Sequence, residues 1–347
     1  MDSLPILDRL EMGHRLRRLR TELAQTLAER WRARQQDLSA APGEPVSRAF
    51  DEDAGEHLDF LAGAVEGGSL AAFEEYARWK SRVLASRALP AADLVQDFED
   101  MEAWLEARLP STGKEAVTRA LRAGAQAAAE ADTEIPGIPA GLSPLQAVQE
   151  QFLRVILRGE RREATRLSLE ALQAGHSIPD LYIEVFQESQ YELGRLWESN
   201  QITVAEEHMA TAVTQSVLAR LYPHIEPTSP PQGNMVVTGV EGEMHQIGAH
   251  MVSDLFEARG WSVRFLGTNV PRAGVVQALA EHDADLLGIS ATMLFSVPNV
   301  VELVHAVRQK FGNARPRILV GGATFRLAPR LAGELGVESC VGDLRQI

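Results

Sequence analysis

The pattern of apolar and polar positions changes character twice along the chain. Residues from about 3 to 130 show only helical periodicity, with apolar residues three and four positions apart among charged ones. Breaks at residues 41–45, 67–68, 89–90 and 110 divide this stretch into five or more helices, the first over residues 4–38 and the third capped by Ser69. We therefore expect an all-α, globin-like domain over residues 1–132.

A second helical region follows a linker at residues 133–141 that is rich in proline and glycine. Helical periodicity returns in four segments at 146–157, 161–174, 179–198 and 204–221, and the loops between them are short. Short loops favour antiparallel neighbours, so the sequence predicts a four-helix bundle over residues 143–224.

From residue 234, after a second linker at 227–233, strand and helix patterns alternate. Strands are expected at 235–239, 262–266, 285–290, 317–321 and 338–341, and helices at 247–259, 272–282, 297–310 and 325–335. The strands are continuous apolar runs, which is typical of a parallel sheet covered on both faces. This pattern predicts a flavodoxin-like, doubly wound α/β domain with a parallel sheet over residues 234–347.

Composition narrows the function classes. The chain has 347 residues and a formal net charge of -14, which disfavours non-specific binding of nucleic acid despite four arginines within residues 15–20. Its one cysteine, Cys340, excludes an internal disulfide framework and a cysteine-based metal cluster, and we expect it to be free and buried. Neither a signal-peptide pattern nor an apolar run long enough to cross a membrane is present, so we expect a cytoplasmic protein.

Candidate chemistry gathers where three of the predicted strands end. The loop at 242–248 places His245 two residues after Glu243, Ser290-Ala291-Thr292 follows the third strand, and Gly321-Gly322 follows the fourth. Open α/β sheets bind ligands at the carboxyl ends of their strands. Small residues at adjacent strand ends leave a slot for a flexible tail, with the hydroxyls of Ser290 and Thr292 free to bind its polar groups.

These three features resemble the cobalamin-binding domain family, whose pattern is Asp-x-His-x-x-Gly, then Ser-x-Leu or Ser-x-Thr, then Gly-Gly. This chain has glutamate, Glu243, in place of the aspartate. The resemblance implies a corrinoid bound base-off, with His245 as lower axial ligand to cobalt, Glu243 orienting the imidazole and the dimethylbenzimidazole tail in the slot. The implied cofactor contacts are Glu243, His245, Gln246, Ile247, Gly248, Ser290, Thr292, Gly321 and Gly322.

The bundle carries residues suited to the upper face of such a cofactor. Thr203 and Glu206 form a capping-box pattern, which assigns Glu206 a structural role. The remaining residues, Trp197, Val204, Glu207 and His208, are similar in type and spacing to the cap of the CarH-type light-sensing cobalamin regulators, which bind adenosylcobalamin. Glu198 stands where those proteins commonly have histidine, and their DNA-binding domain is absent here.

A helical domain ahead of such a module resembles the photocobilins, which bind a bilin in a globin-like domain. This resemblance implies non-covalent biliverdin, since no cysteine precedes Cys340, with contacts from His57, Tyr76, Arg78 and Arg82. The alternative is that Phe73, Tyr76 and Trp79 form an ordinary core stripe, that His57 is a core or surface histidine and that the basic residues form a solvated face.

Together these resemblances predict a light sensor, not an enzyme. Light would cleave the cobalt–carbon bond of adenosylcobalamin and change the packing of the bundle, and the signal would leave through a homo-oligomer or a protein partner, without nucleic acid or membrane. Two alternatives stay open: a corrinoid carrier protein for methyl transfer, and a cobalamin sensor without photochemistry.

Overall fold

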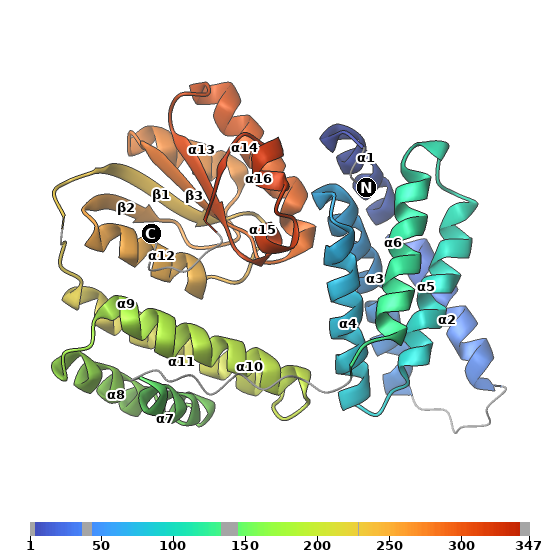
Figure 1. The fold of residues 1–347 in the computed structure, drawn as a ribbon, viewed down its shortest axis with the longest axis horizontal. Coiled ribbons are helices and arrows are strands. Elements are labelled where there is room, and N and C mark those ends of the chain that lie inside the picture. The colour runs from blue at the N-terminus through green and yellow to red at the C-terminus, as the bar shows by residue number, and fades with distance from the viewer. Residues whose placement is uncertain (1–3, 37–43, 133–144, 228, 341–347) are drawn as a thin grey trace. The chain divides into compact units, whose positions relative to one another are not determined.

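The structure is a computed structural model that describes residues 4–36, 44–132, 145–227 and 229–340, with the side chains of 31–36 and 44–53 omitted. The chain divides into two compact units (Figure 1). The helical unit contains the helices before residue 133 together with the segments Met293–Val301 and Ala323–Gly336. The sheet unit contains the bundle and all five strands. The predicted linker at 133–141 lies outside the described residues.

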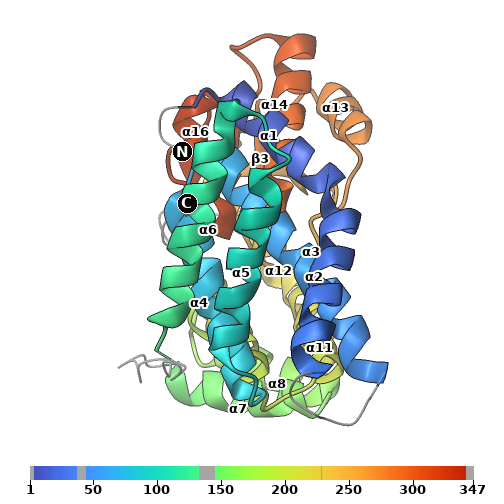
Figure 2. The same cartoon turned by 90° about the vertical axis from the view of Figure 1, so that its right-hand side faces the viewer.

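Six helices form the bulk of the helical unit (Figure 2): α1 (Ile6–Arg18), α2 (Arg20–Gln36), α3 (Glu44–Gly67), α4 (Leu70–Ser86), α5 (Ala91–Glu106) and α6 (Ser111–Ala129). The single helix expected over residues 4–38 is wrong, because the chain breaks at Leu19. Neither glycine nor proline occurs at this break. The break allows α1 and α2 each to pack on α3. The expected cap of α4 is confirmed, since Ser69 Oγ accepts a hydrogen bond from Ala72 N at 3.2 Å.

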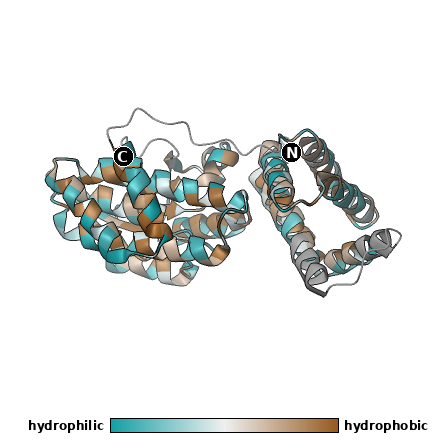
Figure 3. Cartoon of the chain, turned by 90° about the horizontal axis from the view of Figure 1, so that it is seen from below, coloured by the Kyte–Doolittle hydropathy of each residue, from teal (hydrophilic) through white to brown (hydrophobic). Residues whose placement is uncertain are grey.

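The core of the helical unit is rich in aromatic side chains. Phe73 and Phe98 are fully buried, with ring centroids 5.2 Å apart, and Tyr76 lies beside them. Brown apolar and teal polar residues alternate along the helices, as amphipathic helices around a common core require (Figure 3). The helical character of this region is confirmed, and its globin-like topology stays a prediction.

In the sheet unit, the bundle helices lie where periodicity predicts them: α7 (Gln146–Leu157), α8 (Arg161–Gln173), α9 (Ile178–Asp180) continuing through the π-helix η1 (Leu181–Gln187) into α10 (Glu188–Glu198), and α11 (Val204–Leu221). The π-turn was not foreseen, because apolar periodicity does not distinguish it from an α-helix. It carries Tyr182, whose hydroxyl donates a hydrogen bond to Asp254 Oδ2 at 2.6 Å. A short 3₁₀ turn, η2 (Tyr222–His224), ends the bundle.

The five strands are parallel and lie in the order β2-β1-β3-β4-β5: β1 (Gly233–Gly239), β2 (Trp261–Phe265), β3 (Leu286–Ser290), β4 (Arg317–Gly321) and β5 (Glu338–Cys340). They alternate with α12 (Ile247–Ala258), α13 (Arg272–Glu281), η3 (Leu294–Ser296) running into α14 (Val297–Phe311), and α15 (Ala323–Leu327) with α16 (Leu331–Glu334). The doubly wound parallel sheet is therefore confirmed. One helix expected at 325–335 is instead two, since Pro329 lacks an N–H and disfavours helical backbone at Ala328.

Helix α12 links the bundle to the sheet. Its residues Ile247, Met251 and Leu255 belong to the apolar core of the bundle, whereas Ala249 and Phe256 pack with the strands. Because α12 begins directly after the loop at 242–248, the bundle fixes the helix that carries this loop. Among the described helices, none is long and apolar enough to cross a membrane.

Candidate functional site

A buried carboxylate organises the loop at the end of β1. Glu243 is fully buried, and its Oε1 accepts hydrogen bonds from the backbone N of His245 at 2.9 Å and lies 2.7 Å from His245 Nδ1. Its other oxygen, Oε2, accepts from Thr292 N at 2.5 Å. One side chain thus ties the loop after β1 to the loop after β3, although these loops are 49 residues apart.

The pKa values of this pair shift in opposite directions. Burial opposes ionisation of Glu243, but hydrogen bonds from the His245 ring, Thr292 N and His245 N outweigh it and lower its pKa. The hydrogen bond to Glu243 raises the pKa of His245 against the effect of burial, and the charges of Glu243 and Glu207 add to this rise. Glu243 is therefore a carboxylate acting on the imidazole.

This arrangement leaves the other ring nitrogen of His245, Nε2, available to coordinate a metal. With Nδ1 donating to a carboxylate, the neutral tautomer has its lone pair on Nε2, which is the usual geometry of a metal-binding histidine. The His245 side chain is 58% exposed and the neighbouring Met244 is 71% exposed, so a ligand can reach the ring. The glutamate that replaces aspartate in the motif is long enough to make both contacts.

Asn269 is a supporting residue that sequence reasoning missed. It lies in the loop after β2 and accepts a hydrogen bond from Gly242 N at its Oδ1, at 2.9 Å. Gly242 has φ +81° and Asn269 has φ +55°, a left-handed backbone that glycine and asparagine tolerate best. The signal was available, because Asn269 follows a predicted strand at the same edge of the sheet as His245.

The predicted slot residues do meet at the ends of β3 and β4. Ser290 pairs with Gly321, and Ala291 N donates to Gly321 O at 3.0 Å. Gly322 has φ +102°, and a Cβ there would lie 2.2 Å from Ala291 O. Any side chain at Gly322 would therefore force these two loops apart.

The three residues after His245 have different environments. Gln246 precedes α12 at its N-cap position, without a side-chain capping bond. Ile247 is 8% exposed and packs in the bundle core, which gives it a structural role in addition to the predicted one. Gly248 is exposed, and a Cβ built there meets nothing within 4 Å. Packing within the protein therefore does not require glycine at 248.

The start of α11 supplies the candidate cap. Its capping box is present in both directions, with Thr203 Oγ1 accepting from Glu206 N and Glu206 Oε2 accepting from Thr203 N, so the structural role of Glu206 is confirmed. Glu207 Oε2 lies 2.6 Å from His208 Nδ1. The charge of Glu207 makes a small contribution to the rise in the pKa of His245.

The other cap residues are less engaged. His208 is 75% exposed and Val204 is 52% exposed, both on the first turns of α11. Trp197 is half-buried near the end of α10, beside Glu198. The structure thus gathers Glu207, His208 and Val204 at the start of one helix.

The residues predicted for biliverdin belong to the helical unit. His57 is buried, with Nδ1 2.6 Å from Tyr76 Oη, and burial, together with the charge of Lys80, lowers its pKa well below the usual value. Arg78 forms ion pairs with Glu74 and Glu75, and Arg82 lies 3.8 Å from Glu75. His57 and Tyr76 therefore satisfy one another inside the core, which matches the alternative of a core histidine.

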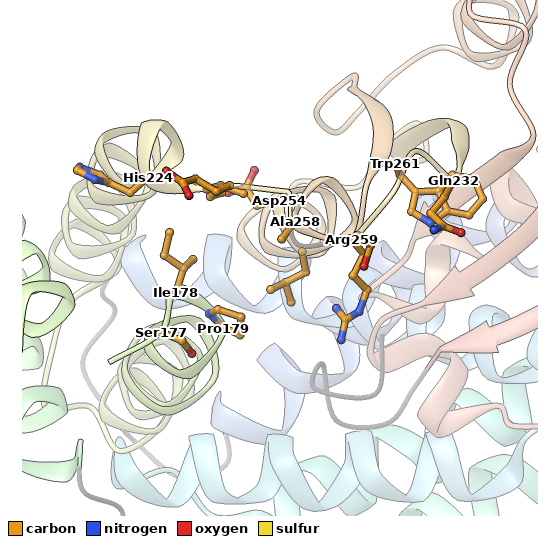
Figure 4. A pocket seen from close by; sticks show the side chains of 13 residues that line it. Ser177, Ile178, Pro179, His224, Gln232, Asp254, Ala258, Arg259 and Trp261 are labelled. Carbon is orange, nitrogen blue, oxygen red and sulfur yellow. The ribbon is translucent and has the colours of Figure 1, made fainter. Parts of the chain in front are cut away.

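A separate pocket of about 650 Å³ lies at the other end of α12 (Figure 4). Ser177, Ile178 and Pro179 line it from the bundle, and Asp254 and Arg259 line it from α12 or the turn after it. None of the residues predicted to bind a cofactor lines this pocket. In the described part of the chain, no group of three or more His, Cys, Asp or Glu side chains forms a metal site.

Comparison with known proteins agrees with this site. Residues 233–345 and residues 148–222 each match a model of a B12 binding domain. A corrinoid protein of Desulfitobacterium hafniense is 24% identical over 182 residues, which are 51% of this chain and 84% of that protein. Dimethylamine corrinoid protein 3 of Methanosarcina acetivorans is 32% identical over 90 residues, which are 26% of this chain and 42% of that protein.

Among solved structures, the monomethylamine corrinoid protein of Methanosarcina barkeri has a TM-score of 0.51 and 22% identity, covering 58% of this chain and 95% of that one. This likeness shows a shared fold for the bundle and the sheet. The two matched domains contain His245, Glu243, the slot residues and the start of α11. With B12 binding domains over both the sheet and the bundle, and corrinoid proteins among its relatives, the chain is a cobalamin-binding protein.

Proposed function

We propose that this chain is a corrinoid carrier for methyl transfer. The observation that carries the proposal is the Glu243 bridge, which orients His245 with Nε2 outward and joins its loop to the slot loop. The relatives support a carrier over the light sensor that the sequence favoured, since their names are those of corrinoid proteins, two of them for methylamines. A carrier has no catalytic residues of its own, so we do not propose an enzyme.

Each part of the site has a role in this function. His245 holds the cobalt from below, and Glu243 fixes its tautomer and orientation. The small residues at 290–292 and 321–322 admit the nucleotide tail of the corrinoid. When bound, the corrinoid supplies a cobalt that accepts a methyl group and passes it on.

A partner must reach the upper side of this site. Val204, Met209 and Met244 are exposed apolar residues near the start of α11 and the His245 loop. We propose that methyltransferases dock here, delivering and removing the methyl group.

A light sensor containing adenosylcobalamin is the second candidate. It is supported by the Glu207–His208 pair at the start of α11, where Glu207 Oε2 lies 2.6 Å from His208 Nδ1. This candidate also includes biliverdin bound in a globin-like helical unit. To bind it, His57 and Tyr76 must break the hydrogen bond between them and contact the bilin instead.

One set of experiments tests both candidates. The protein is loaded in the dark with hydroxocobalamin or adenosylcobalamin, and separately with biliverdin. For a carrier, the reduced bound corrinoid reacts with methyl iodide at a rate close to that of free cobalamin, and illumination of the adenosylcobalamin form leaves the oligomeric state and the amide exchange of α11 unchanged. A protected upper face together with a light-induced change in α11 would overturn the carrier and support the sensor.

A further inference from the structure

Two short segments connect the helical unit to the predicted slot. Residues 293–301 begin directly after Thr292, and residues 323–336 begin directly after Gly322. Both group with α1–α6 rather than with the strands that precede them. We call residues 293–301 and 323–336 the slot segments. Each side of the slot therefore continues into a segment that packs in the helical unit.

The first slot segment is held tightly by α3. Leu294 is 1% exposed and belongs to the apolar core of the helical unit. Gly63 lies so close that a Cβ there would be 2.6 Å from the carbonyl carbon of Leu294. The ring of Phe295 meets the ring of Phe60 edge-on, with centroids 6.1 Å apart, and Phe60 stacks on Tyr76. The residues directly after Thr292 are thus packed against α3.

The second slot segment has its own contacts with the same helices. Ser69 Oγ donates a hydrogen bond to Leu327 O at 2.5 Å, and a Cβ on Gly67 would lie 3.1 Å from Cβ of Ala328. Arg9, which is 3% exposed, forms an ion pair with Glu334 in α16. Apolar, hydrogen-bonding and charged contacts therefore all fix this segment to the helical unit.

The same backbone also forms the slot. Thr292 N donates to Glu243 Oε2, and the next residue starts the segment seated on α3. Gly322 contacts Ala291 O, and the next residue starts α15. The conformation in which the segments dock on the helical unit is thus the one in which Glu243 holds His245. We therefore expect a ligand that stabilises this conformation of residues 290–292 and 321–322 to stabilise the docked segments as well.

We propose that the helical unit senses whether the nucleotide tail of a corrinoid fills the slot. This inference rests on the proposed corrinoid binding and adds a role for the helices outside the B12 binding domains. Insertion of the tail fixes the conformation of residues 290–292 and 321–322. The slot segments, which pack on α3 and α1, transmit this restriction to those helices. The coupling is positive and reciprocal, so docking of the segments strengthens binding of the tail.

Amide hydrogen exchange of the full-length protein tests the coupling. We compare three states: without corrinoid, with hydroxocobalamin, and with cobinamide, which lacks the nucleotide tail. Cobalamin should slow exchange in the C-terminal turns of α3, and cobinamide should leave it near the unloaded rate. Equal protection by both corrinoids, or none by either while both bind, would overturn the inference.

Two glycine substitutions measure the reciprocal effect. Gly63→Ala places a methyl group against the Leu294 backbone, and Gly67→Ala makes a milder contact with Ala328. The ratio of cobalamin to cobinamide affinity should fall in both variants, more in Gly63→Ala, within the range of about 5- to 150-fold typical of coupled sites. Gly333→Ala is the matched control, because a Cβ on this α16 glycine meets nothing within 4 Å.

The outcomes separate this inference from the function on which it rests. If wild-type protein binds neither corrinoid, the carrier proposal fails. If it binds cobalamin through His245 but the affinity ratio is the same in Gly67→Ala, Gly333→Ala and wild type, the carrier stands and the sensing role is wrong. Gly67→Ala decides the question even if Gly63→Ala does not fold.

Discussion

At the scale of single residues, the site depends on one buried carboxylate with two partners. Glu243 holds the His245 ring by one oxygen and the Thr292 backbone by the other. The sequence motif suggested the first contact, because the two residues are two positions apart. The second contact connects separate loops and emerges only in the folded sheet. Replacing Glu243 should therefore disturb the ligand and the slot together.

Glu243→Gln should weaken cobalamin binding about 10- to 100-fold, the usual effect of losing the partner that orients a metal-binding histidine. The amide lacks the charge that stabilises the Nδ1 proton, and its two ends can no longer both accept hydrogen bonds. Spectrophotometric titration with hydroxocobalamin measures the change. The exposed Glu241 offers the control Glu241→Gln, and an equal effect of both substitutions would contradict the assigned role.

His245→Ala should remove the protein nitrogen from cobalt. In the reduced, paramagnetic cobalamin form, the wild-type spectrum should show nitrogen hyperfine splitting that changes when the histidines carry ¹⁵N. The variant should lose this dependence, whereas His305→Ala, at an exposed histidine in α14, should keep it. Unchanged splitting in His245→Ala would exclude His245 as the ligand.

At the scale of elements, the start of α11 carries capping residues and predicted ligand contacts in adjacent positions. Thr203 and Glu206 cap the helix, whereas Glu207 and His208 are predicted to contact the ligand. The sequence could separate these roles because a capping box has a fixed spacing.

Thr203→Ala should lower the free energy of unfolding of the sheet unit by about 0.5–2 kcal/mol, because the N-cap hydrogen bond is lost. Urea denaturation followed by circular dichroism measures this. Thr165→Ala, at a half-buried threonine inside α8, is the comparison and should cost less. A larger loss in Thr165→Ala would show that the capping box contributes little.

The contact between η1 and α12 should make stability depend on pH. Burial raises the pKa of Asp254 to about 6, with the Tyr182 hydrogen bond opposing this shift and the charge of Glu257 adding to it. The folded state therefore binds the Asp254 proton more tightly than the unfolded state, whose aspartate pKa is about 3.9. The contribution of this group to stability falls as pH rises from about 4 to about 6.

Asp254→Asn should flatten that decline, reducing the difference in unfolding free energy between pH 4 and pH 7 by up to about 3 kcal/mol. Glu66, whose pKa burial raises to about 7, acts in the same direction and is unchanged in this variant. Parallel pH profiles for wild type and Asp254→Asn, measured by urea denaturation, would show that the aspartate does not titrate in this way. Glu281→Gln at an exposed site serves as control.

At the scale of the whole molecule, the strands of the sheet belong to one compact unit and two of their connecting segments belong to the other. The segments after β3 and β4 group with the helical unit, although the strands themselves belong to the sheet unit. Ligand binding at the sheet edge therefore has a covalent route to the helices. The predicted boundaries between sensor domain, bundle and sheet domain remain predictions.

Cobalamin should raise the thermal stability of the full chain in a concentration-dependent way, by about 2.7 kcal/mol when the free ligand is 100 times its dissociation constant. Differential scanning calorimetry measures the shift, and His245→Ala should show a smaller one at the same concentration. Biliverdin in place of cobalamin tests the bilin prediction directly. A shift with biliverdin that Tyr76→Phe reduces would support it, and no shift would count against it.

The sequence by itself determined most of the elements and implied the ligand. Continuous apolar runs of strand length predicted the parallel sheet and helical periodicity predicted the bundle, because these signals are local. The resemblance of Glu243, His245 and Gly248 to the cobalamin-binding motif implied a corrinoid. The tertiary structure alone decided what depends on distant residues: the break at Leu19, the π-turn carrying Tyr182, the support of Gly242 by Asn269, and the bond from Thr292 to Glu243. It also showed that the slot segments pack on the helical unit. The sequence could not predict this, because packing between segments more than 200 residues apart leaves no periodic pattern.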